Sequence, residues 1–165
     1  MDLMRALRHL LADNWALRRA FPKAVLHNIE QAVSEAEQRH GGELRFAVEG
    51  GLPLANLWRA QTPRERALEL FGALRVWDTE RNCGVLIYLS LGDRDVEIVA
   101  DRGIQREVGT AGWQAICDRM RAGFREGRFE SGVVEGIRAI GDLLARHFPR
   151  DSGDRNELPD RPLVL

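Results

Sequence analysis

The sequence has little of several features that would place a protein in a well-defined class. It contains two cysteines, Cys83 and Cys117, without CxxC spacing, which excludes a disulfide framework and favours reduced thiols. Its 24 basic residues include a single lysine, Lys23, and 25 acidic residues leave a net charge of −1. This balance argues against a protein that binds nucleic acid by neutralising phosphates.

Long apolar runs are also missing. No stretch approaches the roughly 18 consecutive apolar residues of a membrane span. The first residues carry interspersed charges rather than the unbroken apolar core of a signal peptide. We therefore expect a soluble, cytoplasmic protein without a transmembrane segment.

The short motifs of common enzyme classes are absent. The chain has no HExxH, GxSxG, P-loop or dinucleotide-binding pattern. Its histidines are scattered over predicted helices, which is typical of surface or capping residues rather than of a metal-ligand set. Cys83 lies near acidic residues, which raise the pKa of a thiol, so we do not expect a nucleophile there.

What the sequence does contain begins with an amphipathic helix. Apolar residues recur at spacings of three and four between Leu3 and Trp15. We assign residues 1–21 to a helical extension that packs on the domain, with docking on a partner or on a membrane surface as alternatives. A membrane-surface helix usually carries a strongly basic polar face, and Asp2 and Asp13 dilute the basic charge here.

The middle of the chain predicts a small mixed sheet. Residues Glu43–Glu49 alternate between apolar and polar, whereas Gly84–Ser90 is nearly all apolar, as in a strand buried on both faces. A helix that starts at Thr62-Pro63 lies between them, so a right-handed β-α-β crossover makes these strands parallel. The strand Val96–Ala100 follows after so few residues that it must return antiparallel.

Further helices complete the predicted fold. One spans residues 24–39, and two more, capped by Thr110 and Ser131, follow the last strand. The order predicts an α/β protein, a three-layer α/β/α sandwich with a small mixed sheet (β-α-β plus β-hairpin) and an extra N-terminal amphipathic helix. We place the domain at residues 22–148 and a polar, flexible tail at 149–165, which ends in the apolar Leu163–Leu165.

Polar residues lie just before the central strand and just after its antiparallel neighbour. The residues are Asp78, Glu80 and Asn82 on the first side and Asp101 and Arg102 on the second. Because a hairpin brings both groups to the same end of the sheet, we expect them to converge. Carboxylate and amide oxygens suit Ca²⁺ or Mg²⁺, so the predicted metal ligands are Asp78, Glu80, Asn82 and Asp101. The predicted catalytic residues are Asp78, Asp101 and Arg102, with the metal activating water and Arg102 holding a phosphate.

Two alternatives stay open. Asp and Asn favour turns, and an exposed Asp-Arg pair contributes little, so these residues fit a purely structural role as well. The opposite end of the sheet also carries acidic residues and glycines, and ligand sites in open α/β sheets favour the carboxyl ends of the strands. The residues at that end are Glu49, Gly50, Gly51, Gly92, Asp93 and Asp95.

Two stretches resemble the TPM-domain family. ERALELFGALRVWDTERNCGVLIYLSLGDRDVEIVADRGI combines a helix with an R-A-x-x-x-F core, a strand beginning G-V-L-I, a hairpin and a glycine-containing turn. FREGRFESGVVEGI joins the two closing helices. The resemblance covers Val25 to Phe148 and implies a compact α/β/α sandwich, binding of divalent cations such as calcium, and the acid phosphatase activity reported for some members. It also implies a membrane-protein partner of the LemA-like kind and a place peripheral to the membrane.

The sequence departs from the family pattern beside the predicted site. Cys83 stands where members usually have asparagine, and Asn82 lies one position earlier. Asp101 replaces a glycine and Gln105 replaces an acid. If those family residues bind metal, this chain has lost or rearranged the site. We therefore expect a cation-binding domain with weak phosphatase activity or, as the alternative, a non-catalytic interaction module that acts with a membrane protein in cell-envelope maintenance.

Overall fold

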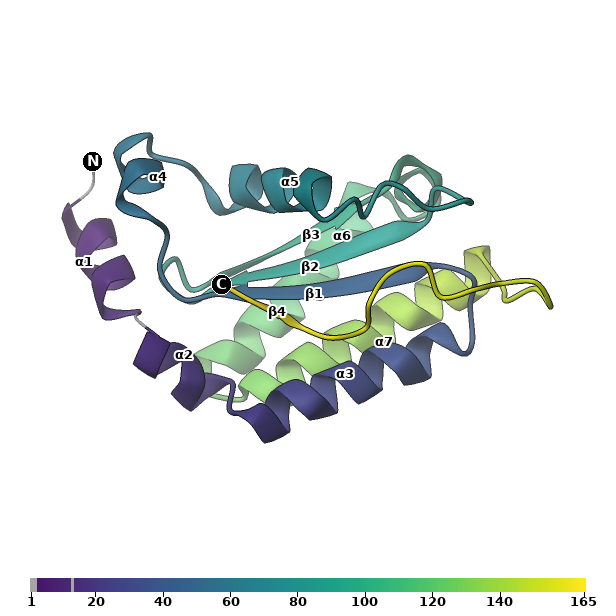
Figure 1. Ribbon diagram of the computed structural model, residues 1–165, viewed down its shortest axis with the longest axis horizontal. Helices are drawn as coiled ribbons and strands as arrows, with labels where there is room; N and C mark the ends of the chain where they lie inside the picture. The colour runs from purple at the N-terminus through teal and green to yellow at the C-terminus, as the bar shows by residue number, and fades with distance from the viewer. Residues whose placement is uncertain (1–2, 13) are drawn as a thin grey trace.

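A four-stranded sheet with helices on both faces forms the centre of the computed structural model, which describes residues 3–12 and 14–165 (Figure 1). The strands, in the spatial order β3-β2-β1-β4, are β1 (Glu43–Glu49), β2 (Gly84–Ser90), β3 (Asp95–Ala100) and β4 (Leu163–Val164). The helices are α1 (Leu3–Leu11), α2 (Asn14–Ala20), α3 (Lys23–Glu37), α4 (Leu54–Trp58), α5 (Pro63–Ala73), α6 (Arg102–Arg125) and α7 (Phe129–His147). The predicted α/β/α sandwich is confirmed.

The register of the sheet follows from the crossover and the hairpin. β1 and β2 run parallel, from Glu43 opposite Gly84 to Glu49 opposite Ser90. β3 returns antiparallel beside β2. α5 forms the crossover, and its start carries the predicted capping box, in which Thr62 accepts a hydrogen bond from the backbone N–H of Glu65. All residues of β1 and β2 are buried, as an apolar central strand requires.

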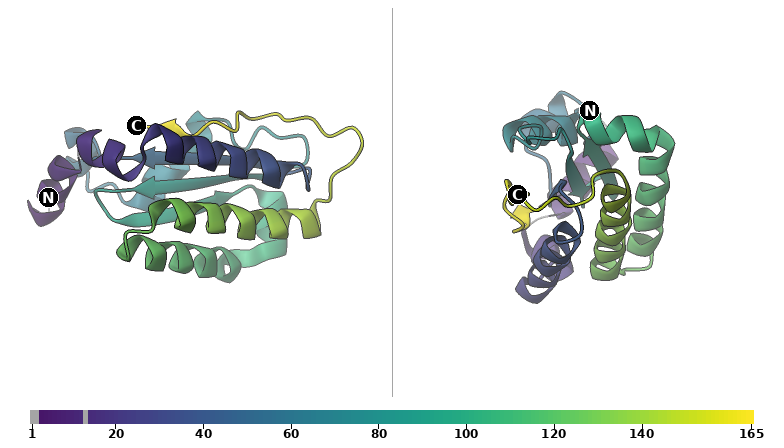
Figure 2. Two further views of the ribbon diagram at one scale, coloured as in Figure 1. Left: turned by 90° about the horizontal axis from the view of Figure 1, so that it is seen from below. Right: turned by 90° about the vertical axis from the view of Figure 1, so that its right-hand side faces the viewer.

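Alternate residues of the strands feed two separate cores. Phe46, Ile87 and their neighbours in register belong to a large core on the face covered by α3, α6 and α7 (Figures 1 and 2). Leu86 and Tyr88 belong to a smaller core under α5. The period of two along each strand thus explains why both faces of the sheet need a helical cover.

The helix starts differ from the prediction. α6 begins at Arg102, directly after Asp101, which caps it, but a break at Gly109 divides it into two helical stretches, and the second follows from Thr110, where the sequence predicted a helix start. The backbone does leave helical geometry at Gly109, where φ is 70°, a conformation that favours glycine. α7 begins at Phe129, so Ser131 lies inside its first turn and caps nothing. Short α4 was not predicted at all.

The C-terminal segment lies along the sheet, where the sequence predicted a flexible tail. β4 pairs in parallel with β1 through Ala47 opposite Leu163. The Arg45 guanidinium donates to the carbonyl oxygens of Pro159 and Arg161, and the Leu158 N–H donates to the Glu43 carboxylate at 2.9 Å. These long-range contacts hold a segment that is polar apart from its last three residues, an apolar run too short to predict a strand.

Candidate functional site

The hairpin brings the two predicted polar groups side by side. The Asp101 N–H donates to the Gly84 carbonyl oxygen at 2.8 Å, and the Gly103 N–H donates to the Asn82 carbonyl oxygen at 3.0 Å. Asn82 has a φ of 51°, in the left-handed region that asparagine tolerates better than most residues. The loop before β2 and the start of α6 therefore form one polar end of the sheet.

Asp101 is the buried residue of this end. Its side chain accepts a hydrogen bond from the Arg102 N–H at 2.6 Å, which caps the first helical stretch of α6. Asp101 is 7% exposed, and within the described residues its second oxygen, Oδ2, is buried without a hydrogen-bond partner. A buried carboxylate oxygen without a donor is costly, which makes this atom a candidate contact for water or for a ligand.

The other predicted ligands do not gather around Asp101. Asp78, Glu80, Asn82 and Arg102 are all exposed. The Glu80 N–H donates to the Glu157 carboxylate at 3.3 Å, which ties this loop to the C-terminal segment. Over residues 3–12 and 14–165, no three His, Cys, Asp or Glu side chains lie close enough to share an ion. The structure thus joins Asn82 to the Asp101 turn through the backbone, but it does not assemble the predicted set of carboxylates.

Cys83, at the start of the same strand, is a buried structural thiol. Its Sγ–H donates to the Gly41 carbonyl oxygen at 3.2 Å, and its N–H donates to Thr79 Oγ1 at 3.1 Å. Burial raises the pKa of the Cys83 thiol to about 11. The thiolate is therefore rare near neutral pH, which agrees with the expectation that Cys83 is no nucleophile.

At the opposite end of the sheet, Glu49 has a full set of partners. Arg66 donates two hydrogen bonds to its carboxylate, at 2.8 and 3.0 Å. The Tyr88 hydroxyl donates to the same carboxylate at 2.7 Å. This buried pair links α5 to the smaller core, and its complete hydrogen bonding indicates a structural role.

Asp93, in the turn between β2 and β3, fastens the N-terminal helix to the domain. Arg5 donates to both of its oxygens, at 2.7 and 3.1 Å, and His9 Nε2 lies 3.1 Å from Oδ1. His9 Nδ1 accepts a hydrogen bond from the Leu52 N–H, which places the ring proton on Nε2. Burial alone would raise the pKa of Asp93, but Arg5 and His9 hold it below its usual value. We call Asp93, Arg5 and His9 the α1 latch.

The latch orients α1 in an unexpected way. The helix packs on the domain through its polar side, where Ala6 and His9 are buried. Its leucines face solvent, with exposed fractions of 75% for Leu3, 48% for Leu7, 62% for Leu10 and 69% for Leu11. The sequence pattern predicted the amphipathic helix correctly, but it gave no indication that the apolar side would point outward.

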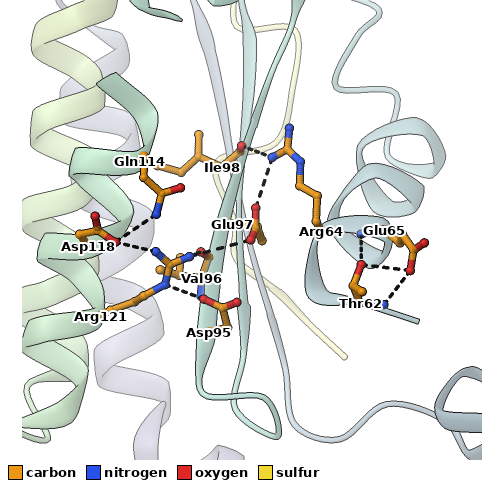
Figure 3. Close-up of polar contacts among 10 residues, drawn as sticks. All are labelled: Thr62, Arg64, Glu65, Asp95, Val96, Glu97, Ile98, Gln114, Asp118 and Arg121. Carbon is orange, nitrogen blue, oxygen red and sulfur yellow. Dashed lines mark hydrogen bonds and ion pairs between the residues drawn. The ribbon is translucent and has the colours of Figure 1, made fainter. Parts of the chain in front are cut away.

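An arginine network closes the free edge of the sheet (Figure 3). From α6, Arg121 donates to Asp95 at 2.6 Å and to the Val96 carbonyl oxygen at 2.9 Å. From α5, Arg64 donates to the Ile98 carbonyl oxygen at 2.6 Å. These donors satisfy outward carbonyl groups of β3, an edge strand that would otherwise offer them to another chain. The sequence gives no sign of this network because its members come from three separate elements.

A large hollow of the described surface lies between α1–α2 and the start of α7. This groove has a volume of about 1040 Å³. Its apolar lining includes Val25, Phe129 and Val134, and its charged lining is mainly arginine. The arginines are Arg8, Arg19, Arg94 and Arg128, against the single acid Glu130. An apolar hollow with a basic rim suits a ligand that is both apolar and anionic.

No helix within residues 3–12 and 14–165 combines the length and apolar character that crossing a bilayer requires. The chain is similar to the BA42 protein of the psychrophilic bacterium Bizionia argentinensis, whose NMR structure it matches with 29% identity and a TM-score of 0.76, over 86% of this chain and 93% of that one. It also shares the fold of the N-terminal domain of a P. gingivalis protein, at 21% identity and a TM-score of 0.56, over 73% of this chain and 76% of that one. No curated protein matches the chain.

The family comparison agrees with the topology and with the position of the hairpin. The model of the TPM domain matches residues 18–143, from the end of α2 to the last turns of α7. This range contains β1 to β3, both polar ends of the sheet and the arginine network, and it leaves out α1, most of α2, the last residues of α7 and the C-terminal segment. The chain belongs to the TPM-domain family.

Proposed function

We propose that this TPM-domain protein binds one divalent cation, Ca²⁺ or Mg²⁺, at the Asp101 end of the sheet and has weak activity on phosphoesters. The observation that carries the proposal is the buried Oδ2 of Asp101, which has no hydrogen-bond partner among the described residues. A cation is a suitable ligand for such an oxygen because it compensates a carboxylate without needing a donor proton.

The residues around Asp101 would bind a divalent cation weakly rather than tightly. Asp101 would supply a carboxylate, and the neighbouring loop would offer oxygens of Asn82 and, from exposed positions, of Asp78 and Glu80. With few protein ligands held in place, water completes the coordination, and we expect a dissociation constant on the order of 10⁻⁴ to 10⁻³ M. When bound, the ion would supply charge for a phosphate and a more acidic water. Exposed Arg102, at the first position of α6, would hold the phosphate as a bidentate donor.

The test uses Asp101→Asn, because asparagine caps a helix about as well as aspartate and α6 should stay intact. Titration of the wild type with CaCl₂ and with MgCl₂, followed by ¹H–¹⁵N NMR, should give saturable shifts at residues 80–84 and 101–104. The variant should lose them, whereas Asp118→Asn, an exposed position on the same helix, should keep them. Hydrolysis of p-nitrophenyl phosphate should follow the same order. Linear, unsaturated shifts in the wild type, or equal binding by Asp101→Asn, would reject the site.

A second candidate is a non-catalytic interaction module that acts with a membrane-protein partner, LemA-like by family resemblance, in cell-envelope maintenance. The groove favours it, because an apolar lining with four arginines and one acid suits an acidic amphipathic helix of such a partner. A labelled acidic amphipathic peptide of about 15 residues should bind, a scrambled peptide should not, and Val134→Glu should abolish the binding. Absence of any difference between the two peptides would reject this role for the groove.

A further inference from the structure

We propose that α1 is a membrane-docking element, whose leucine face inserts into the interfacial layer of an anionic bilayer while its polar face holds it on the domain. The residues that would insert are Leu3, Leu7, Leu10 and Leu11. This inference does not depend on a cation at Asp101, which lies at the other end of the sheet.

The direction of the helix carries the inference. An amphipathic helix normally buries its apolar stripe against the core, because removing that surface from water is the main source of its stability. Here the latch holds the helix the other way round: Arg5 and His9 reach Asp93, and the leucines stay about half to three-quarters exposed. The exposed leucine face is stabilised when another apolar phase covers it, and large exposed apolar surfaces mark interaction sites.

The position of α1 fits a flat partner. The helix lies at one end of the molecule, beyond the carboxyl ends of β1 and β2 (Figures 1 and 2). A bilayer accepts a helix lying in its plane with the apolar side inward and the polar side toward water, which is the orientation that the latch imposes. Trp15, 67% exposed at the start of α2, belongs to the residue type that is enriched at membrane interfaces.

The charge of this region selects the lipid. Residues 1–23 contain five basic residues, Arg5, Arg8, Arg18, Arg19 and Lys23, against two acids, Asp2 and Asp13. Arg8 on α1 and Arg18 and Arg19 on α2 are exposed. Basic residues near a surface favour anionic headgroups. They disfavour a second copy of the same face, because two basic segments would meet. Asp2 and Asp13 reduce the basic charge of this segment but leave basic residues in excess over acidic ones.

Vesicle flotation with the full chain provides the test. The wild type should float with vesicles of equal parts phosphatidylcholine and phosphatidylglycerol, and much less with phosphatidylcholine alone or at high salt. Leu7→Glu and Leu10→Glu should each weaken the binding by about tenfold or more, since each puts a charge into the interfacial layer. Leu68→Glu is the matched control: Leu68, on α5, is 49% exposed against 48% for Leu7, and its substitution should leave flotation unchanged. Thermal unfolding should show that all three variants are folded.

Several results would overturn the proposal. The wild type failing to float with anionic vesicles, or Leu7→Glu floating as well as the wild type, would each do so. A dimer in light scattering that Leu7→Glu dissociates would assign the face to a second copy of the chain. Binding of the acidic amphipathic peptide that Leu7→Glu abolishes, without vesicle binding, would assign it to a protein. Asp101→Asn should float like the wild type, because membrane binding by α1 does not depend on a cation at Asp101. A failure of the cation proposal therefore does not affect the flotation test.

Discussion

Neutralising Asp93 should release α1 while the domain stays folded. The bidentate contact with Arg5 is a charge-assisted pair of hydrogen bonds between side chains that are 17% and 9% exposed. Such a pair contributes about 2 kcal/mol when partly buried, so Asp93→Asn should open the α1 contact about 30-fold more often. The hydrogen bond from Arg5 to the Gln61 carbonyl oxygen remains, which limits the effect. Once undocked, a helix of nine residues is not stable in water.

Hydrogen exchange resolved by residue is the appropriate assay. In Asp93→Asn, amides of residues 6–12 should exchange about 30-fold faster, while amides of β1 and β2 keep their wild-type rates. Asp118→Asn, which removes an exposed partner of Arg121, should leave α1 unchanged. Because the folded pKa of Asp93 is depressed, the contribution of the latch is present above the unfolded pKa and is lost as the pH falls through the folded one. Unchanged exchange in α1, or faster exchange throughout the sheet, would refute the reasoning.

Three further predictions concern the rest of the domain. Burial raises the pKa of Glu37 to about 9, so the stability that its protonated form contributes is fully present below about pH 4.5 and is lost as the pH rises toward 9. Glu37→Gln should therefore raise the free energy of unfolding by about 1–2 kcal/mol at pH 8 and hardly at pH 4. Urea unfolding at both pH values measures the difference. Burial likewise raises the pKa of Cys83 and of Cys117 to about 11, so both thiols should react with Ellman's reagent far more slowly in the native protein than in the unfolded protein. A thiol of the native protein that reacts as fast as in the unfolded protein would contradict this. Deleting Leu163–Leu165 removes β4 and two backbone hydrogen bonds beyond it, and should cost about 2 kcal/mol in the same unfolding assay; no loss would show that the segment is not held on β1.

The sheet could be predicted because its signals are local. The bounds of β1 and β2 agree with the sequence to the residue, since each strand is a continuous apolar or alternating run between polar breaks. The short connection after Ser90 left an antiparallel return as the only option. The capping box at Thr62 was equally local. Each of these features depends on residues within one element or one turn.

The remaining features depend on contacts that no local pattern contains. The direction of α1 is set by Asp93, more than 80 residues away, and the amphipathic pattern is the same whichever side faces the domain. The C-terminal segment becomes an edge strand because β1 offers it a partner. Asp101, predicted as a metal ligand, proved first to be a helix cap, a role that its sequence position after β3 allowed but did not distinguish. Topology placed the polar ends correctly, but it could not determine which side chains would meet there.

The polar face of α1 holds the helix on the domain, and its leucines are directed away from it. The most direct measurement is solvent paramagnetic relaxation of methyl signals in the membrane-free protein, with a neutral gadolinium chelate as the agent. We expect the methyls of Leu3, Leu7 and Leu10 to relax as strongly as those of exposed Leu68, and the His9 ring to show NOEs to Leu52. Protected leucine methyls together with an exposed His9 ring would contradict it.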